Sequence, residues 1–260
     1  METHKHPCLN CGAMPMGAYC QNCGQKADTH RISLPHLIKH DLVHGIWHFD
    51  KGLLFTLREA FVRPGHMAMD YIKGKRIKYY NVFYLILIVL GINILTAGFF
   101  KSYYHVVEKA APEGLVVDQE SVNISYYVKH YFKLLLFLVI PFFALSGLLS
   151  FRKLKLNFAE HAIIGGSLML AGAMWYFFVI VGIYTSISVN SDIFNLLVWG
   201  FGIITFLQPA RVYYQAAAKE YSTGAFLLRL LQWYSYVACL LFLVLLVIAL
   251  FTGKSHIILS

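Results

Sequence analysis

Residues 79–100 read YYNVFYLILIVLGINILTAGFF, a run without a single Asp, Glu, Lys or Arg. A helix needs about 20 mostly apolar residues to cross a bilayer, so this run predicts a membrane span. The same pattern recurs along the rest of the chain. Four further stretches carry no charged residue: Leu134–Phe151, Ala162–Ser191, Ile193–Ala210 and Leu230–Gly253.

The composition agrees with a membrane protein and excludes an ordinary soluble domain. Charged residues make up 13% of the chain and hydrophobic residues 58%, whereas soluble domains carry about 25% charged residues. Five buried helices of a soluble core would leave too little polar sequence to cover that core. We therefore predict an all-α membrane protein with five spans, at about 80–100, 132–151, 162–185, 193–213 and 230–252.

The distribution of basic residues predicts the orientation of these spans, because cytoplasmic segments are enriched in Lys and Arg. Residues 1–78 hold eleven Lys and Arg, whereas 101–130 hold three against four acidic residues. Basic residues return at 152–155, are absent from 186–192, and return between the fourth and fifth spans. This alternation predicts a cytoplasmic N-terminus and an external C-terminus. The net charge of +9 then reflects topology, and we expect no nucleic-acid partner.

Four of the five cysteines form two C-x-x-C pairs, Cys8 with Cys11 and Cys20 with Cys23. This spacing lets both thiolates of a pair face one metal, and four cysteines form a closed, structural zinc site. Two disulfides are the alternative, which a reducing cytoplasm disfavours. We predict a zinc ribbon at 1–29 with Zn²⁺ in a structural role. No export signal is expected, since residues 1–78 contain no apolar leader-like run.

Residues 30–78 are predicted to form amphipathic helices beside the membrane, ahead of a transmembrane domain at 79–253. Four histidines there recur every four residues and fall on one helical stripe. Histidines at this spacing can chelate a transition metal, but we favour the alternative of a polar helix face at the membrane interface. The four histidines are His36, His40, His44 and His48.

Several short pieces of the chain together match a pattern known from one family. They are Cys8-x-x-Cys11-Gly12, Tyr19-Cys20-x-x-Cys23-Gly24-Gln25, Arg31, Asp50-Lys51-Gly52, Thr56-Leu57, Pro64-Gly65, Tyr71-Ile72-x-Gly74-Lys75-Arg76, Tyr79, Glu160-His161 and Arg211-Val212-Tyr213. In these pieces the chain resembles uncharacterised multi-pass membrane proteins of Bacteroidota, classed as a domain of unknown function. The resemblance implies a protein of the bacterial cytoplasmic (inner) membrane, with an N-terminal zinc ribbon and a Y-I-x-G-K-R-x-x-Y motif. It implies no activity.

Six polar residues are expected at the cytoplasmic boundary of the spans, where they either converge on one polar or headgroup site or act as separate anchors. Within this set we expect Glu160, which opens the third span, to pair with Arg211, which closes the fourth. The six residues are Lys75, Arg76, Arg152, Glu160, His161 and Arg211.

The chain contains no P-loop, no G-x-S-x-G and no paired-carboxylate motif, so we assign no catalytic residue and favour a non-enzymatic protein. We expect an adaptor or scaffold whose ribbon contacts a cytoplasmic protein partner, in a chain that also contacts membrane lipids. Two alternatives stay open, a small transporter or channel that acts as a homo-oligomer, and an enzyme acting on lipid headgroups through Glu160 and His161.

Overall fold

A computed structural model describes residues 6–29, 31–34, 52–108, 139–189 and 192–257. The described residues beyond the N-terminal cysteine region are almost entirely helical, and a single isolated bridge joins Tyr19 to Lys26. The elements are α2 (Gly52–Val62), α3 (Pro64–Ile72), α4 (Val82–Glu108), the 3-10 turn η2 (Arg152–Leu154), α6 (Phe158–Val189), α7 (Asp192–Ala217) and α8 (Thr223–Ile257). A further helix, Val139–Ser150, precedes η2.

Four helices of the described part are long and apolar enough to cross a membrane. They are Val82–Phe100 in α4, Phe158–Thr185 in α6, Asn195–Ala217 in α7 and Thr223–Val244 in α8. Each overlaps a predicted span, and together they indicate a membrane protein. The other predicted span, 132–151, is described only as the shorter apolar helix Val139–Ser150, so the total of five spans stays a prediction.

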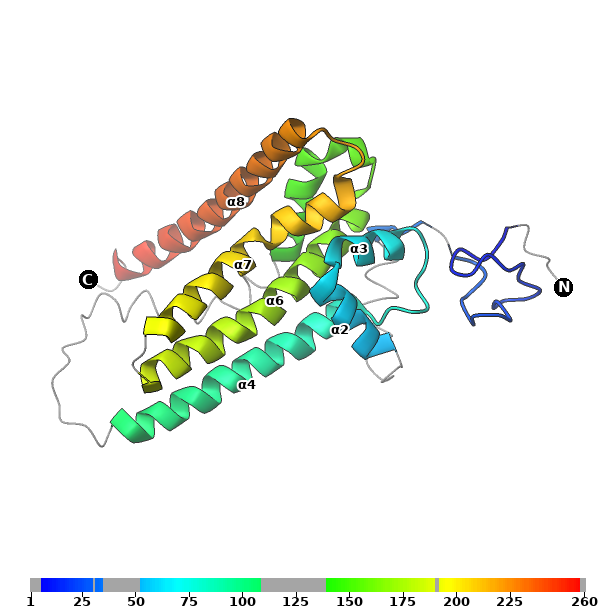
Figure 1. Ribbon diagram of the computed structural model, residues 1–260. Helices are drawn as coiled ribbons and strands as arrows, with labels where there is room; N and C mark the ends of the chain where they lie inside the picture. The colour runs from blue at the N-terminus through cyan, green and yellow to red at the C-terminus, as the bar shows by residue number, and fades with distance from the viewer. Residues whose placement is uncertain (1–5, 30, 35–51, 109–138, 190–191, 258–260) are drawn as a thin grey trace.

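The helix α6 forms the centre of the bundle. It packs between α4 and α7 (Figure 1). In its most apolar stretch 61% of the residues are buried, compared with 22% for α7 and 6% for α8. Small residues allow this close packing. A side chain on Gly165, for example, would meet Phe143 of the helix Val139–Ser150 at 3.1 Å.

Three fully buried aromatic side chains hold the other helices together. Phe151 stacks on Tyr213 of α7 with ring centroids 4.2 Å apart, and Trp233 of α8 lies 5.7 Å from the same tyrosine. Their exposed fractions are 0 to 1%. This aromatic contact fixes the first part of α8, whose other side chains are mostly exposed.

The short helices α2 and α3 form a corner at one end of the bundle (Figure 1). Pro64 occupies the first turn of α3, where no backbone N–H is needed. Gly65 has to be small, because a Cβ at this position would clash with the carbonyl oxygen of Val212 in α7. Its backbone N–H donates to the side-chain oxygen of Gln215 at 2.9 Å. The Pro64-Gly65 pair therefore fastens the corner to α7.

Candidate metal centre

The four predicted ligands come together at the N-terminus. The sulfur atoms of Cys8, Cys11, Cys20 and Cys23 all lie within 4.8 Å of one another, and the closest pairs are 3.5 and 3.6 Å apart. A tetrahedral site with metal–sulfur bonds of about 2.3 Å places its sulfurs about 3.8 Å apart. All four cysteines are free thiols, so the alternative of two disulfides is not formed. The cluster can hold a metal ion.

Two identical backbone turns position these cysteines. In the first turn, the N–H of Cys8 donates to the carbonyl of Ala13 at 2.9 Å, and the N–H of Gly12 donates to the carbonyl of Cys8 at 2.8 Å. The second turn repeats both bonds at the residues twelve positions later. Gly12 and Gly24 adopt positive φ angles of 77° and 75°, a conformation that favours glycine. The glycine after each C-x-x-C pair is thus explained.

The environment of the thiols favours a bound cation. The backbone N–H of Ala13 and the side chain of Asn22 lower the pKa of Cys11 to about 6. The backbone N–H of Gln25 acts in the same direction on Cys23, but burial and the neighbouring thiols Cys11 and Cys8 outweigh it and raise the pKa of Cys23 to about 11. One thiolate forms readily and repels a second. A cation removes this repulsion and allows all four thiolates to bind it.

The side chain of Gln25 connects the ribbon (residues 6–29) to the Gly74 loop (residues 73–79, between α3 and α4). Its Nε2 donates to the carbonyl of Gly74 at 2.8 Å, while its Oε1 accepts from the backbone N–H groups of Arg76 and Ile77 at 3.1 and 3.3 Å. Gln25 is 3% exposed. Leu9 also packs on Gly74, where an added Cβ would lie 2.5 Å from its Cδ1. The ribbon therefore sits directly on this loop.

A second connection joins the chain after the ribbon to the start of α6. The Nε and a terminal amino group of Arg31 each donate to the carboxylate of Glu160 at 2.8 Å, and Arg31 also donates to the carbonyl of Lys155 at 3.0 Å. Glu160 and Asn157 cap α6 reciprocally, each side chain accepting from the other's backbone N–H, at 2.8 and 2.9 Å. The amide of Asn157 donates to the carbonyl of Ile32 at 2.9 Å.

This arrangement corrects one prediction. Glu160 does not pair with Arg211, because Arg31 and the backbone of Asn157 already occupy its carboxylate. Arg211 donates instead to the carbonyl of Val62. The reason is the α2–α3 corner, which packs against the end of α7 and brings its own backbone to Arg211. The apolar pattern of the spans alone gave no sign of that corner.

The other predicted polar residues make separate contacts in different parts of the structure, and no shared site is shown among them. Lys75 bonds to Asp70 at 2.8 Å, and the guanidinium of Arg76 lies 5.6 Å from the ring centre of Tyr71. Arg152 is exposed and donates to the carbonyl of Leu149 at 3.2 Å. His161 is buried, with 1% of its surface exposed. A headgroup site at these residues stays a prediction. The four histidines of the predicted stripe lie outside the described residues.

Asp70 organises the Gly74 loop, and the sequence analysis missed it. Its carboxylate accepts from Lys75 at 2.8 Å, from Lys78 at 3.4 Å and from the hydroxyl of Tyr79 at 3.1 Å. Burial raises the pKa of Asp70, but the bond from Lys75 and the charge of Lys78 outweigh it and hold this pKa below its usual range. The available signal was a single acidic residue next to the densest basic run of the chain.

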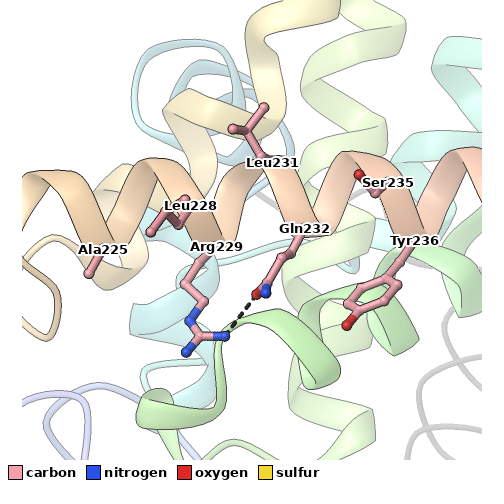
Figure 2. Close-up of a pocket in the computed structure, with 7 residues that line it drawn as sticks. All are labelled: Ala225, Leu228, Arg229, Leu231, Gln232, Ser235 and Tyr236. Atoms are coloured by element: carbon pink, nitrogen blue, oxygen red, sulfur yellow. Dashed lines mark hydrogen bonds between the residues drawn. The ribbon is translucent and has the colours of Figure 1, made fainter.

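The structure also contains a shallow pocket of about 390 Å³ along α8 (Figure 2). Arg229, Gln232 and Tyr236 point to one side of the helix there, and Arg229 donates to the Gln232 side chain at 2.8 Å. None of the predicted site residues lines this pocket.

Comparison with known proteins relates part of the chain to one described family. The model of a family of proteins of unknown function, DUF3667, matches residues 50–92. No curated protein and no solved structure matches the chain. The matched residues comprise α2, α3, the Gly74 loop and the first part of α4. The chain is thus similar to this family in the part on which the ribbon sits.

Proposed function

We propose that the chain is a non-enzymatic membrane adaptor, whose zinc-bound ribbon presents an apolar surface to a cytoplasmic protein. The observation that carries this proposal is the exposure of three side chains on a firmly attached ribbon. Met14, Met16 and Tyr19 are 58%, 71% and 62% exposed, whereas Gln25 of the same ribbon is buried in the Gly74 loop. Methionines adapt to many partner shapes, and tyrosine is enriched at interfaces.

Zinc is the proposed metal because four thiolates in a closed tetrahedral arrangement suit Zn²⁺. Cys8, Cys11, Cys20 and Cys23 would hold it, and no position stays open for water or substrate. Such a metal supplies folding energy to a segment with little core of its own. It stabilises the surface that the partner contacts and takes part in no reaction.

The contacts of Glu160 speak against the alternative of a headgroup enzyme. Both oxygens of its carboxylate are held by Arg31, and one also accepts from the backbone N–H of Asn157. A general acid or base needs a free oxygen within reach of the substrate. Glu160 therefore acts in this proposal as a cap and an anchor.

The proposal places the ribbon in the cytoplasm of a bacterial inner-membrane protein. The basic alternation supports this orientation. The helices α4 and α6 both begin at the ribbon end, which agrees with the predicted parallel direction of the first and third spans. Impermeant thiol labelling of intact cells tests it. A cysteine at Ser121 is expected to react from outside and one at Lys155 is not. Labelling at 155 without permeabilisation contradicts the orientation.

The adaptor function is tested by photo-crosslinking from position 16, followed by purification in mild detergent and mass spectrometry. We expect a cross-linked protein that is lost in Met14→Ser with Tyr19→Ser. The control is Leu54→Ser in α2, which removes a side chain of similar exposure (76%) outside the ribbon. Cross-links that persist in the ribbon variant, or disappear equally in the control, contradict the proposal.

A further inference from the structure

Four buried polar side chains lie on three elements that pack together, the helix Val139–Ser150, α6 and α7. Ser146, Ser150, His161 and Tyr213 are each 0 to 1% exposed. Within the described part of the protein, the Oγ atoms of both serines, the Nδ1 of His161 and the hydroxyl of Tyr213 have no hydrogen-bond partner. Native interiors rarely leave buried polar groups unpaired. Four at one helix contact therefore require an explanation.

Gly147 shows that two of these atoms converge on one point. A Cβ at Gly147 would lie 2.8 Å from Nδ1 of His161 and would clash with the hydroxyl oxygen of Tyr213. The two atoms approach this glycine from α6 and from α7. Ser146 and Ser150 flank it on the same side of their helix, one turn apart. Glycine therefore allows both polar atoms to approach the backbone of this helix closely.

The neighbouring side chains do not complete the hydrogen bonding of this cluster. The ring of Trp233 lies beside Tyr213, but its N–H donates to the carbonyl of Phe143 at 3.4 Å. An indole N–H can only donate, so it offers no acceptor for the hydroxyl proton of Tyr213. The carboxylate of Glu160, which precedes His161 in the chain, is held by Arg31.

The chemistry of the cluster selects its ligand. It contains three hydroxyl groups and one imidazole, and no carboxylate or permanent cation. A charged ligand would find no opposite charge there, whereas a small neutral molecule that both donates and accepts matches every group. Buried water typically makes about three bonds to otherwise unpaired polar groups.

We propose that Ser146, Ser150, His161 and Tyr213 form an internal water site inside the helical bundle, at the end that carries the ribbon. The water accepts the hydroxyl proton of Tyr213 and bonds to Nδ1 of His161, and the serine hydroxyls complete its coordination. The site links α6, α7 and the helix Val139–Ser150 through hydrogen bonds in an otherwise apolar contact. It is independent of the adaptor function.

X-ray radiolytic footprinting of the full-length protein in detergent tests this site. Water bound next to a side chain produces hydroxyl radicals in place and labels that side chain, although bulk solvent cannot reach it. We expect labelling of Tyr213. The internal control is Met67, which is equally buried (1% exposed), more easily oxidised, and part of the other apolar cluster. Labelling of Tyr213 without labelling of Met67 therefore excludes global unfolding as its source.

Two variants complete the test. Gly147→Ala puts a methyl group between the two polar atoms and is expected to abolish the labelling of Tyr213. Tyr213→Phe retains the ring and its packing, so this variant should fold normally. It is expected to reduce labelling at His161. Absence of labelling at Tyr213 in the unmodified protein overturns the proposal. So does labelling of His161 that is unchanged in Tyr213→Phe.

Discussion

The bond network of Gln25 gives the sharpest test of how the ribbon is attached. This single side chain makes three hydrogen bonds to the Gly74 loop, two of them from the backbone N–H groups of Arg76 and Ile77. Gln25→Ala removes all three. It leaves the backbone turn intact, because that turn uses the carbonyl of residue 25 and not its side chain. The variant therefore weakens the attachment without altering the metal cluster.

The expected magnitude follows from the number of bonds. A net contribution of about 0.5–1.5 kcal/mol for each hydrogen bond gives a total of about 1.5–4.5 kcal/mol. Since 1.4 kcal/mol corresponds to a factor of ten, detachment of the ribbon becomes about ten- to a thousand-fold more frequent. Two of the three bonds share one acceptor, the Oε1 of Gln25, at 3.1 and 3.3 Å, so we expect a value in the lower part of this range.

Hydrogen exchange measured by mass spectrometry reads this change directly. The amide proton of Ile77 bonds to Gln25 and should exchange faster in Gln25→Ala by the factor above. The amide proton of Arg76 also bonds to the carbonyl of Gly74 at 3.0 Å, so its exchange should increase by a smaller factor. The control is Gln21→Ala, which removes an exposed glutamine of the same ribbon that bonds to Met16. Unchanged exchange at 76 and 77 in Gln25→Ala would refute the assigned contact.

Two further predictions concern the metal and the second attachment. Elemental analysis of the purified protein should find about one zinc per chain, as a single four-cysteine site requires. The double variant Cys11→Ser with Cys20→Ser should lose this zinc, while its chain still inserts into membranes. Zinc retained in the double variant would place the metal elsewhere. Glu160→Gln and Arg31→Gln should each lower the melting temperature in detergent, and their combination should cost less than the sum. The losses of melting temperature caused by Glu160→Gln and Arg211→Gln should add up in the double variant. The assignment would be reversed if these two losses were not additive and those of Glu160→Gln and Arg31→Gln were.

The spans could be predicted because the bilayer imposes a simple requirement on composition. Their ends were less accurate, since a charge-free run ends at a charge, whereas a helix ends where its backbone is capped. The third predicted span began at 162, but α6 begins at Phe158 because Asn157 and Glu160 cap it. The last began at 230, but α8 starts at Thr223. The charged and polar residues in the first turns of α6 and α8 interrupt the apolar pattern, so a prediction from that pattern places the helix start too late.

The candidate site divides in the same way into local and distant parts. The cysteine cluster depends on spacings of a few residues, so the sequence was sufficient. The contacts of the ribbon with the bundle are made between distant residues: Gln25 and Gly74 are 49 positions apart, and Arg31 and Glu160 are 129 apart. Local spacing carries no information on such pairs. For the same reason the proximity of His161 to Tyr213 became visible only in the fold.

The position of Gln25 argues that the metal cluster and the membrane helices form one structural unit. Its carbonyl accepts from the N–H of Cys20 and closes the second metal-binding turn, while its side chain bonds to the Gly74 loop. The same loop is arranged around Asp70 and leads directly into α4. Unfolding of the turn therefore withdraws the side chain from the loop, and the loop cannot keep its bonds to Gln25 if the turn is lost. Together with Leu9 on Gly74 and Arg31 on Glu160, Gln25 thus couples the folding of the cysteine cluster to the loop that leads into the first membrane helix.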